Sequence, residues 1–136
     1  MSTVRVRHTV GDLAADLRHI ATTCHDDMVD VVKDGIRVGN EVAKDYARES
    51  SGRVARKYPG TFSAAMNRGY RGKDVSVIEG EYGPRAAGQG ELASVLEGGS
   101  RNNPPHNDLA KSADLIGPAF QGEVHRLPDR WFWPNR

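Results

Sequence analysis

Apolar residues recur every three or four positions over a long stretch of the chain. From Asp12 to about residue 50 they form one series: Leu13, Leu17, Ile20, Cys24, Met28, Val31, Gly35, Val38, Val42 and Tyr46. This spacing places them on one stripe of a helix, because a helical turn takes 3.6 residues. The pattern predicts a long N-terminal amphipathic helix.

Two glycines fall inside this series. Gly35 and Gly39 each cost about 1 kcal/mol relative to alanine in a helix interior, so a break or bend is expected near Gly35 to Asn40. The segment is then a weakened helix or a turn between two helices. The other interpretation is that the glycines let a second helix cross closely.

The residues before the helix follow a different pattern. Val4 and Val6 alternate with Arg5 and Arg7, which suits a short edge strand or an extended arm laid on a neighbour. We favour an arm over residues 1–11. At the other end, residues 127–136 place Trp131, Phe132 and Trp133 side by side. This aromatic tail either anchors in a neighbouring subunit or folds back onto its own core.

The middle of the chain is dense in turn residues. We expect a short helix at about residues 61–68 between loops, and a strand at residues 74–82 that Gly83 and Pro84 end. A second short helix is expected at about residues 89–97, with Leu92, Val95 and Leu96 facing inward.

An ordered turn, Gly98 to Pro105, follows that second short helix, and we call it the corner. Gly98 and Gly99 can take the positive φ that closes a helix, and Pro104 and Pro105 stiffen the connection. Asn107 is expected to cap a last helix from about Asp108, which should stop or kink at Gly117 and Pro118. Its inward residues are predicted to be Leu109, Ala113 and Ile116.

These elements predict one α+β domain over residues 12–126: a long helix on a small sheet, two short C-terminal helices and extended terminal arms. With 136 residues, 38% of them hydrophobic, and a mean hydropathy of −0.61, the core is lean. We therefore expect apolar surface to be buried against partners.

Charge and cysteine content bear on two questions: whether the protein binds nucleic acid or membranes, and in which compartment it matures. The net charge of +1 gives no overall field for nucleic acid or an anionic membrane. Basic residues do gather in residues 48–73, so a small nucleic-acid-binding module is the alternative hypothesis. A single cysteine, no signal peptide and no span of about 18 apolar residues indicate maturation in a reducing cytoplasm.

No group of residues forms a convincing catalytic or metal site. The potential ligands His19, Cys24, His25, Asp26, Asp27 and Asp30 belong to one helix. His19 and His25 would lie on different faces of it, whereas a zinc pair prefers positions i and i+4. Neither the phosphate-loop pattern nor the dinucleotide-binding glycine pattern is present. We expect a protein without cofactor or metal that is not an enzyme; a small hydrolase using His25 or His106 is a weaker alternative.

Residues 58–120 resemble the small tail-component, or tail-completion, family of long-tailed bacteriophages. The family pattern is an amphipathic helix, a glycine-marked segment, a strand, a leucine-rich turn with glutamate, glycine and a hydroxyl residue, a proline element and a closing helix. The matching segments are Leu13 to Tyr46, Tyr58-Pro59-Gly60, Val75 to Tyr82, Leu96-Glu97-Gly98-Gly99-Ser100, Pro104-Pro105 and Leu109 to Ile116.

The resemblance implies a virion structural protein of the neck, assembled in host cytoplasm, that completes the tail tube and joins it to the head. It implies a homo-oligomeric, hexameric ring that contacts other neck and tail proteins and passes DNA without reading it; a tail terminator or head-side connector would be similar. The residues expected at interfaces are Val4, Arg5, Val6, Glu97, Ser100, Asn102, Asn103, Pro104, Pro105, Trp131, Phe132 and Trp133.

Overall fold

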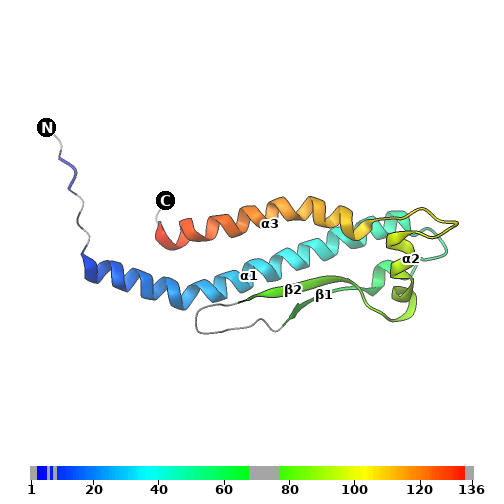
Figure 1. Ribbon diagram of the computed structural model, residues 1–136, viewed down its shortest axis with the longest axis horizontal. Coiled ribbons are helices and arrows are strands. Elements are labelled where there is room, and N and C mark those ends of the chain that lie inside the picture. Colours follow the sequence, from blue (N-terminus) through cyan, green and yellow to red (C-terminus); the bar gives the residue numbers. More distant parts are fainter. Residues whose placement is uncertain (1–2, 6, 8, 68–76, 134–136) are drawn as a thin grey trace.

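A computed structural model of the chain describes residues 3–5, 7, 9–67 and 77–133. Its spine is helix α1, Val10–Ser50, with helix α3, Asp108–Phe132, along one side. The antiparallel strands β1, Phe62–Asn67, and β2, Glu79–Pro84, lie on the other side (Figure 1). The protein is therefore α+β, as predicted, with a long N-terminal helix, a small sheet and two further helices.

Helix α1 is continuous over 41 residues. It begins in a capping box, in which Asp12 N–H donates to Thr9 Oγ1 at 3.1 Å and Thr9 N–H donates to Asp12 Oδ2 at 3.1 Å. The predicted break near Gly35 to Asn40 is wrong, because packing on both sides of α1 offsets the glycines' low helix propensity.

Gly35 and Gly39 lie where aromatic rings of neighbouring elements approach the α1 backbone closely. A Cβ at Gly35 would lie 2.8 Å from the Phe120 ring of α3, and a Cβ at Gly39 would lie 2.6 Å from the Tyr82 ring of β2. Only glycine leaves room for these aromatic rings beside the α1 backbone. The alternative prediction, that the glycines let a second helix come close, is thus confirmed at Gly35. At Gly39 the element that comes close is strand β2.

The segment after α1 corrects another prediction. A 3-10 helix, Tyr58–Thr61, leads directly into β1, where a helix was expected over residues 61–68. Strands β1 and β2 pair from Phe62 opposite Pro84 to Asn67 opposite Glu79. Pairing with β2 satisfies the backbone N–H and C=O groups of these residues, most of which a helix of one or two turns would leave unpaired. The expected strand begins later, at Glu79; residues 68–76 lie outside the described part.

The main core lies near the C-terminal end of α1. It consists of Ala43, Ala47, Ala55, Tyr58 and Phe62, with Tyr82, Ala93, Leu96 and Leu109 packed against it. The Tyr58 and Phe62 rings meet edge to face, with centroids 5.1 Å apart. The core is small, as the composition predicted.

The two short elements after β2 only partly match their prediction. A 3-10 helix, Gly88–Leu92, continues into helix α2, Ala93–Gly98. Leu92 and Val95 are 39% and 41% exposed, so their predicted inward orientation is wrong, while Leu96 packs on the core. A helix of six residues at the edge of the molecule can turn only one face inward.

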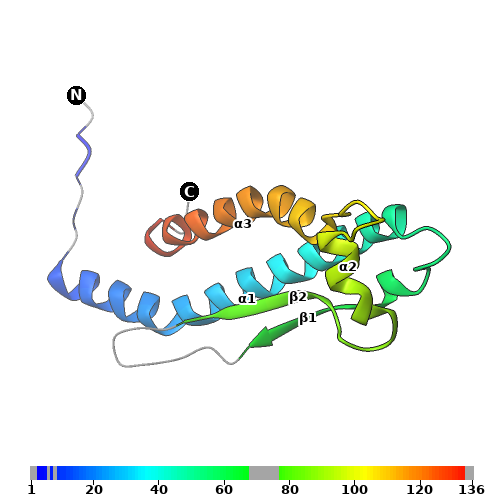
Figure 2. The same ribbon diagram turned by 45° about the vertical axis from the view of Figure 1, so that its right-hand side comes forward.

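Helix α3 does not stop at Gly117 and Pro118 but runs on to Phe132, with Pro118 and Pro128 inside it. It lies antiparallel to α1, and Figures 1 and 2 show the two helices side by side. Leu127 is fully buried, so the segment expected to start the tail is part of the packed helix. Contact with α1 stabilises α3 enough to accommodate the hydrogen bond lost at Pro118.

Replacing Gly39 by alanine tests the close approach to Tyr82. Gly39→Ala should lower the free energy of unfolding by about 1 kcal/mol, because overpacking costs more than the gain in helix propensity. Gly122→Ala in α3, where a Cβ would meet nothing within 4 Å, should raise it. Urea unfolding of both variants measures the two signs; equal signs would contradict the packing explanation.

Candidate assembly interface

The N-terminal end of α1 extends beyond the elements that pack against this helix. Helix α3 and the two strands end before this part, residues 10–17, which we call the α1 overhang (Figure 1). Its apolar side chains lie three or four residues apart on one face, and Val10, Leu13 and Leu17 are 85%, 47% and 48% exposed. The overhang therefore continues the apolar stripe of α1 into solvent.

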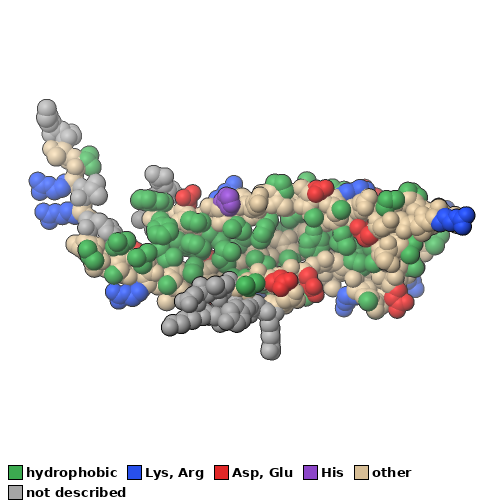
Figure 3. Space-filling view, in the orientation of Figure 1, with side chains coloured by type: hydrophobic (Ala, Val, Ile, Leu, Met, Phe, Trp, Pro, Cys, Tyr) green, Lys and Arg blue, Asp and Glu red, His purple; other side chains and the backbone are tan. Residues whose placement is uncertain are grey.

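Apolar surface also gathers where α1 and α3 meet. Figure 3 shows hydrophobic side chains along this seam, continuing onto the overhang. A protein of this size rarely leaves a continuous apolar surface uncovered unless it binds something there.

The three tail aromatics divide into two groups. Trp131 is half-buried, and its Nε1 donates to Asp27 Oδ2 of α1 at 2.6 Å. Phe132 and Trp133 are 51% and 59% exposed. Trp131 thus folds back onto its own chain, whereas Phe132 and Trp133 present exposed aromatic surface at the end of α3.

The arm and the corner lie at opposite ends of the molecule. Val4, 88% exposed, and Arg5 precede α1 at the end that carries the tail aromatics, whereas the loop from Gly99 to Asn107 is at the far end (Figure 1). Val6 lies outside the described residues. The predicted interface residues therefore form two separate surfaces.

The corner is an ordered turn with exposed side chains. Ser100 N–H donates to Asn103 O at 2.8 Å, and Asn103 N–H donates to Ser100 O at 3.2 Å. Gly99 has a φ of 78°, as predicted for a residue that ends a helix. The residues of this surface are Ser100, Asn102, Asn103, Pro104 and Pro105, all exposed.

Glu97 has an internal role at the base of this corner. Leu109 N–H donates to both carboxylate oxygens of Glu97 at 3.1 Å, so Glu97 caps α3. The predicted cap by Asn107 is wrong: Asn107 is left-handed, with φ 54°, and its side chain makes no capping hydrogen bond. The sequence did not indicate this cap, because Glu97 lies twelve positions before Leu109 and capping residues are normally recognised next to the helix start.

A group of buried polar side chains surrounds this cap. Asp108 is fully buried, and its Oδ2 accepts from Ser50 Oγ at 2.7 Å and lies 3.9 Å from His106 Nδ1. Burial raises the pKa of Glu97, and the Asp108 charge adds to the rise, whereas the Leu109 and Asp108 amides lower it. Burial, with the charges of Glu97 and Asp108, raises the pKa of Tyr58 to about 12.

These polar residues do not form a catalytic triad. Ser50 donates to Asp108, and His106 uses its backbone N–H to bond Leu96 O at 2.8 Å. Among the described residues, no imidazole nitrogen hydrogen-bonds the Ser50 hydroxyl, so none is placed to activate it. Within the described ranges, no cluster of three or more histidine, cysteine, aspartate or glutamate residues could hold a metal ion.

The described part of the basic segment runs from the end of α1 into the turns that follow. Arg48 pairs with Asp45 at 2.5 Å on α1, and Arg53, Arg56 and Lys57 are exposed in the turns that follow. Arg68, Arg71 and Lys73 lie outside the described residues. No helix in the described part of the chain is long and apolar enough to cross a membrane.

Comparison with protein-family models, curated proteins and solved structures found no match for this chain.

Removing the Glu97 charge should change how stability depends on pH. A carboxyl whose pKa is raised on folding contributes stability below its unfolded pKa, and the contribution is lost as pH rises through the folded pKa. Starting from the ordinary value of 4.5, wild type should lose stability relative to Glu97→Gln as pH rises, because Gln still accepts from Leu109.

Urea unfolding at a series of pH values measures this difference. Glu91→Gln, at an exposed position of the preceding 3-10 helix, is the control for loss of one carboxylate. A difference between wild type and Glu97→Gln that stays flat, or that favours wild type with rising pH, would contradict the burial argument.

Proposed function

We propose that this protein is a structural subunit of a homo-oligomeric ring in the neck of a long-tailed bacteriophage. In this position the ring completes the tail tube, joins it to the head and lets DNA pass through its lumen. The protein contributes shape and binding surfaces, and no chemical step is assigned to it. The observation that carries the proposal is the α1 overhang, an apolar helix face that projects past its own core.

The energetics of the overhang favour a partner. A helix of two turns has little stability of its own, and the capping box fixes only its start. Burying apolar surface is worth about 25 cal/mol per Å², so covering Val10, Leu13 and Leu17 with another subunit would stabilise both chains. A small internal core and a large external apolar face are the features expected of such a subunit.

The two separate surfaces favour a ring over a symmetric pair. Different surfaces that meet head to tail make a heterologous contact, and such contacts close into rings when the rotation allows. The arm and tail aromatics at one end, and the corner at the other, provide two unlike surfaces. The assignment to the neck of a phage particle is based on the resemblance of residues 58–120 to tail-completion proteins. A tail terminator ring or a head-side connector ring would have the same features.

The self-association of the overhang can be tested with charged substitutions. Leu13→Asp combined with Leu17→Asp should abolish oligomers, because each carboxylate would be buried in an apolar contact. Both positions are about half exposed, so the helical circular dichroism signal should remain. Sedimentation velocity measures the assembly state.

The matched control places the same two charges on the opposite face of the same helix. Ala15 and Thr22 are exposed there, so Ala15→Asp with Thr22→Asp should assemble as wild type does. A wild-type chain that stays monomeric at high concentration, or a Leu13→Asp, Leu17→Asp variant that assembles normally, would rule out the overhang as the assembly surface.

The place of the protein in a particle is a second, independent test. Labelled protein should be found at the head–tail junction in a fixed, small number of copies. Cryo-electron microscopy of tagged particles gives the position, and quantitative mass spectrometry gives the copy number. Absence from purified mature particles would overturn the assignment to the neck.

A further inference from the structure

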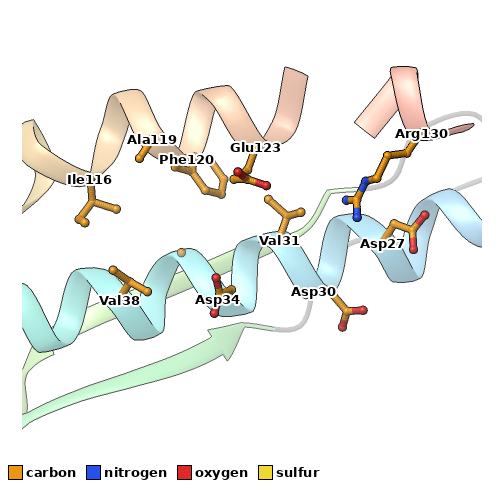
Figure 4. A pocket seen from close by; sticks show the side chains of 11 residues that line it. Asp27, Asp30, Val31, Asp34, Val38, Ile116, Ala119, Phe120, Glu123 and Arg130 are labelled. Atoms are coloured by element: carbon orange, nitrogen blue, oxygen red, sulfur yellow. The ribbon is translucent and has the colours of Figure 1, made fainter. Parts of the chain in front are cut away.

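A groove with an apolar floor and acidic edges lies between α1 and α3, with a volume of about 340 Å³. Figure 4 shows its floor, with Ile116, Ala119 and Phe120 pointing from α3 toward Val31 and Val38 of α1. We call this site the acidic groove. Its floor suits small branched apolar side chains.

Negative charge dominates the edges of the acidic groove. Four carboxylates line it, from Asp27, Asp30, Asp34 and Glu123, against the single cation of Arg130. Asp34 and Glu123 form exposed i, i+3 pairs with Arg37 and Arg126, and such pairs exchange partners at little cost. The Asp30 carboxylate makes neither an ion pair nor a hydrogen bond with the described residues. The groove therefore matches a ligand that combines apolar and positively charged groups.

The N-terminal arm has this combination. Val4, Arg5 and Arg7 lie close together in the sequence before α1, and all three side chains are exposed. In an extended chain, successive side chains point to opposite sides. An arginine next to a valine on the floor therefore starts on the outer side, and its long side chain can bend back to the carboxylates along the edges.

Val4, Arg5 and Arg7 cannot reach the groove of their own chain. Asp27 lies 18 residues after the helix cap Thr9, which is about 27 Å along the helix axis. Val4 can lie no more than about 18 Å from Thr9, because only five residues separate them. The described residues of this segment, drawn in blue before α1, stand clear of α3 and the strands in two views (Figures 1 and 2). An arm that fills this groove must come from another copy.

We propose that the acidic groove receives the N-terminal arm of a second copy of this chain. The inference rests on the proposed function, since it specifies the contact that links neighbouring subunits. The arm of each subunit enters the groove of the next, so the contact is heterologous and every groove in a closed ring is filled. The contact is polar at its edges and apolar at its centre, as in stable protein interfaces.

Charge reversal on each side, and on both sides together, tests the pairing. Arg5→Glu with Arg7→Glu should weaken association at least tenfold, and Asp30→Lys with Asp34→Lys should do the same, because attractive pairs become repulsive. A chain that carries all four substitutions should associate again, since opposite charges face each other once more. Sedimentation equilibrium at low salt measures each constant.

The control is Asp45→Lys with Asp114→Lys, which reverses two exposed acids of the same two helices outside the groove. It should associate as wild type does. Equal weakening in this control, or no recovery in the four-substitution chain, would overturn the arm contact. If these variants assemble normally while the protein is found in the neck, the proposed function stands and the inference falls.

A cross-link gives a direct readout of the same contact. In a Cys24→Ser background, a Val4→Cys chain mixed with a Val38→Cys chain should give a covalent dimer with a short bismaleimide. Neither chain alone should give this product. Replacing the second partner by Ala110→Cys, exposed on α3 away from the groove, is the control. An assembled sample without the Val4–Val38 product would overturn the proposal.

Discussion

The structure depends on a mismatch in length between α1 and the elements that pack against it. Helix α1 has 41 residues, whereas α3 has 25 and each strand has six. Packing therefore stabilises α1 only along part of its length, and the apolar stripe continues beyond the cover. A helix gains most of its stability in water from such packing, so the uncovered turns are the part that benefits most from a second chain.

Close packing around two glycines holds the three layers together. Phe120 of α3 lies against Gly35, and Tyr82 of β2 lies against Gly39 one turn later. The Tyr82 hydroxyl is 2.8 Å from Ser112 Oγ of the fully buried Ser112, which joins β2 directly to α3. Strand β2 and helix α3 thus both pack against one short stretch of α1. This packing sets the distance between α1 and α3, and with it the width of the groove between them.

The sequence predicted the features that local periodicity determines and missed those that depend on distant partners. The long N-terminal helix, the helix from Asp108 and the Gly99 turn follow from spacing and backbone preference, and all three are present. The fully covered face of α1 was not predicted: its buried residues, Val32, Gly39, Asn40, Ala43 and Ala47, lie outside the predicted apolar series. Strand β1 has weak strand propensity and forms because β2 is beside it. The Glu97 cap, the Trp131 bond to Asp27 and the acidic groove join residues far apart in sequence. No local pattern marks them.

The chemistry of the two ends explains why contact between unlike surfaces is favoured. One end carries arginines, valines and exposed aromatics, whereas the other carries asparagines, a serine and two prolines. Two copies of the first end would bring arginines together, which disfavours a symmetric contact there. The corner is held by its Ser100–Asn103 bonds and by proline geometry, so little conformational entropy is lost when a partner binds it. Each subunit therefore has two unlike ends, one with arginines, valines and exposed aromatics and one with the ordered corner, and unlike ends are what head-to-tail assembly requires.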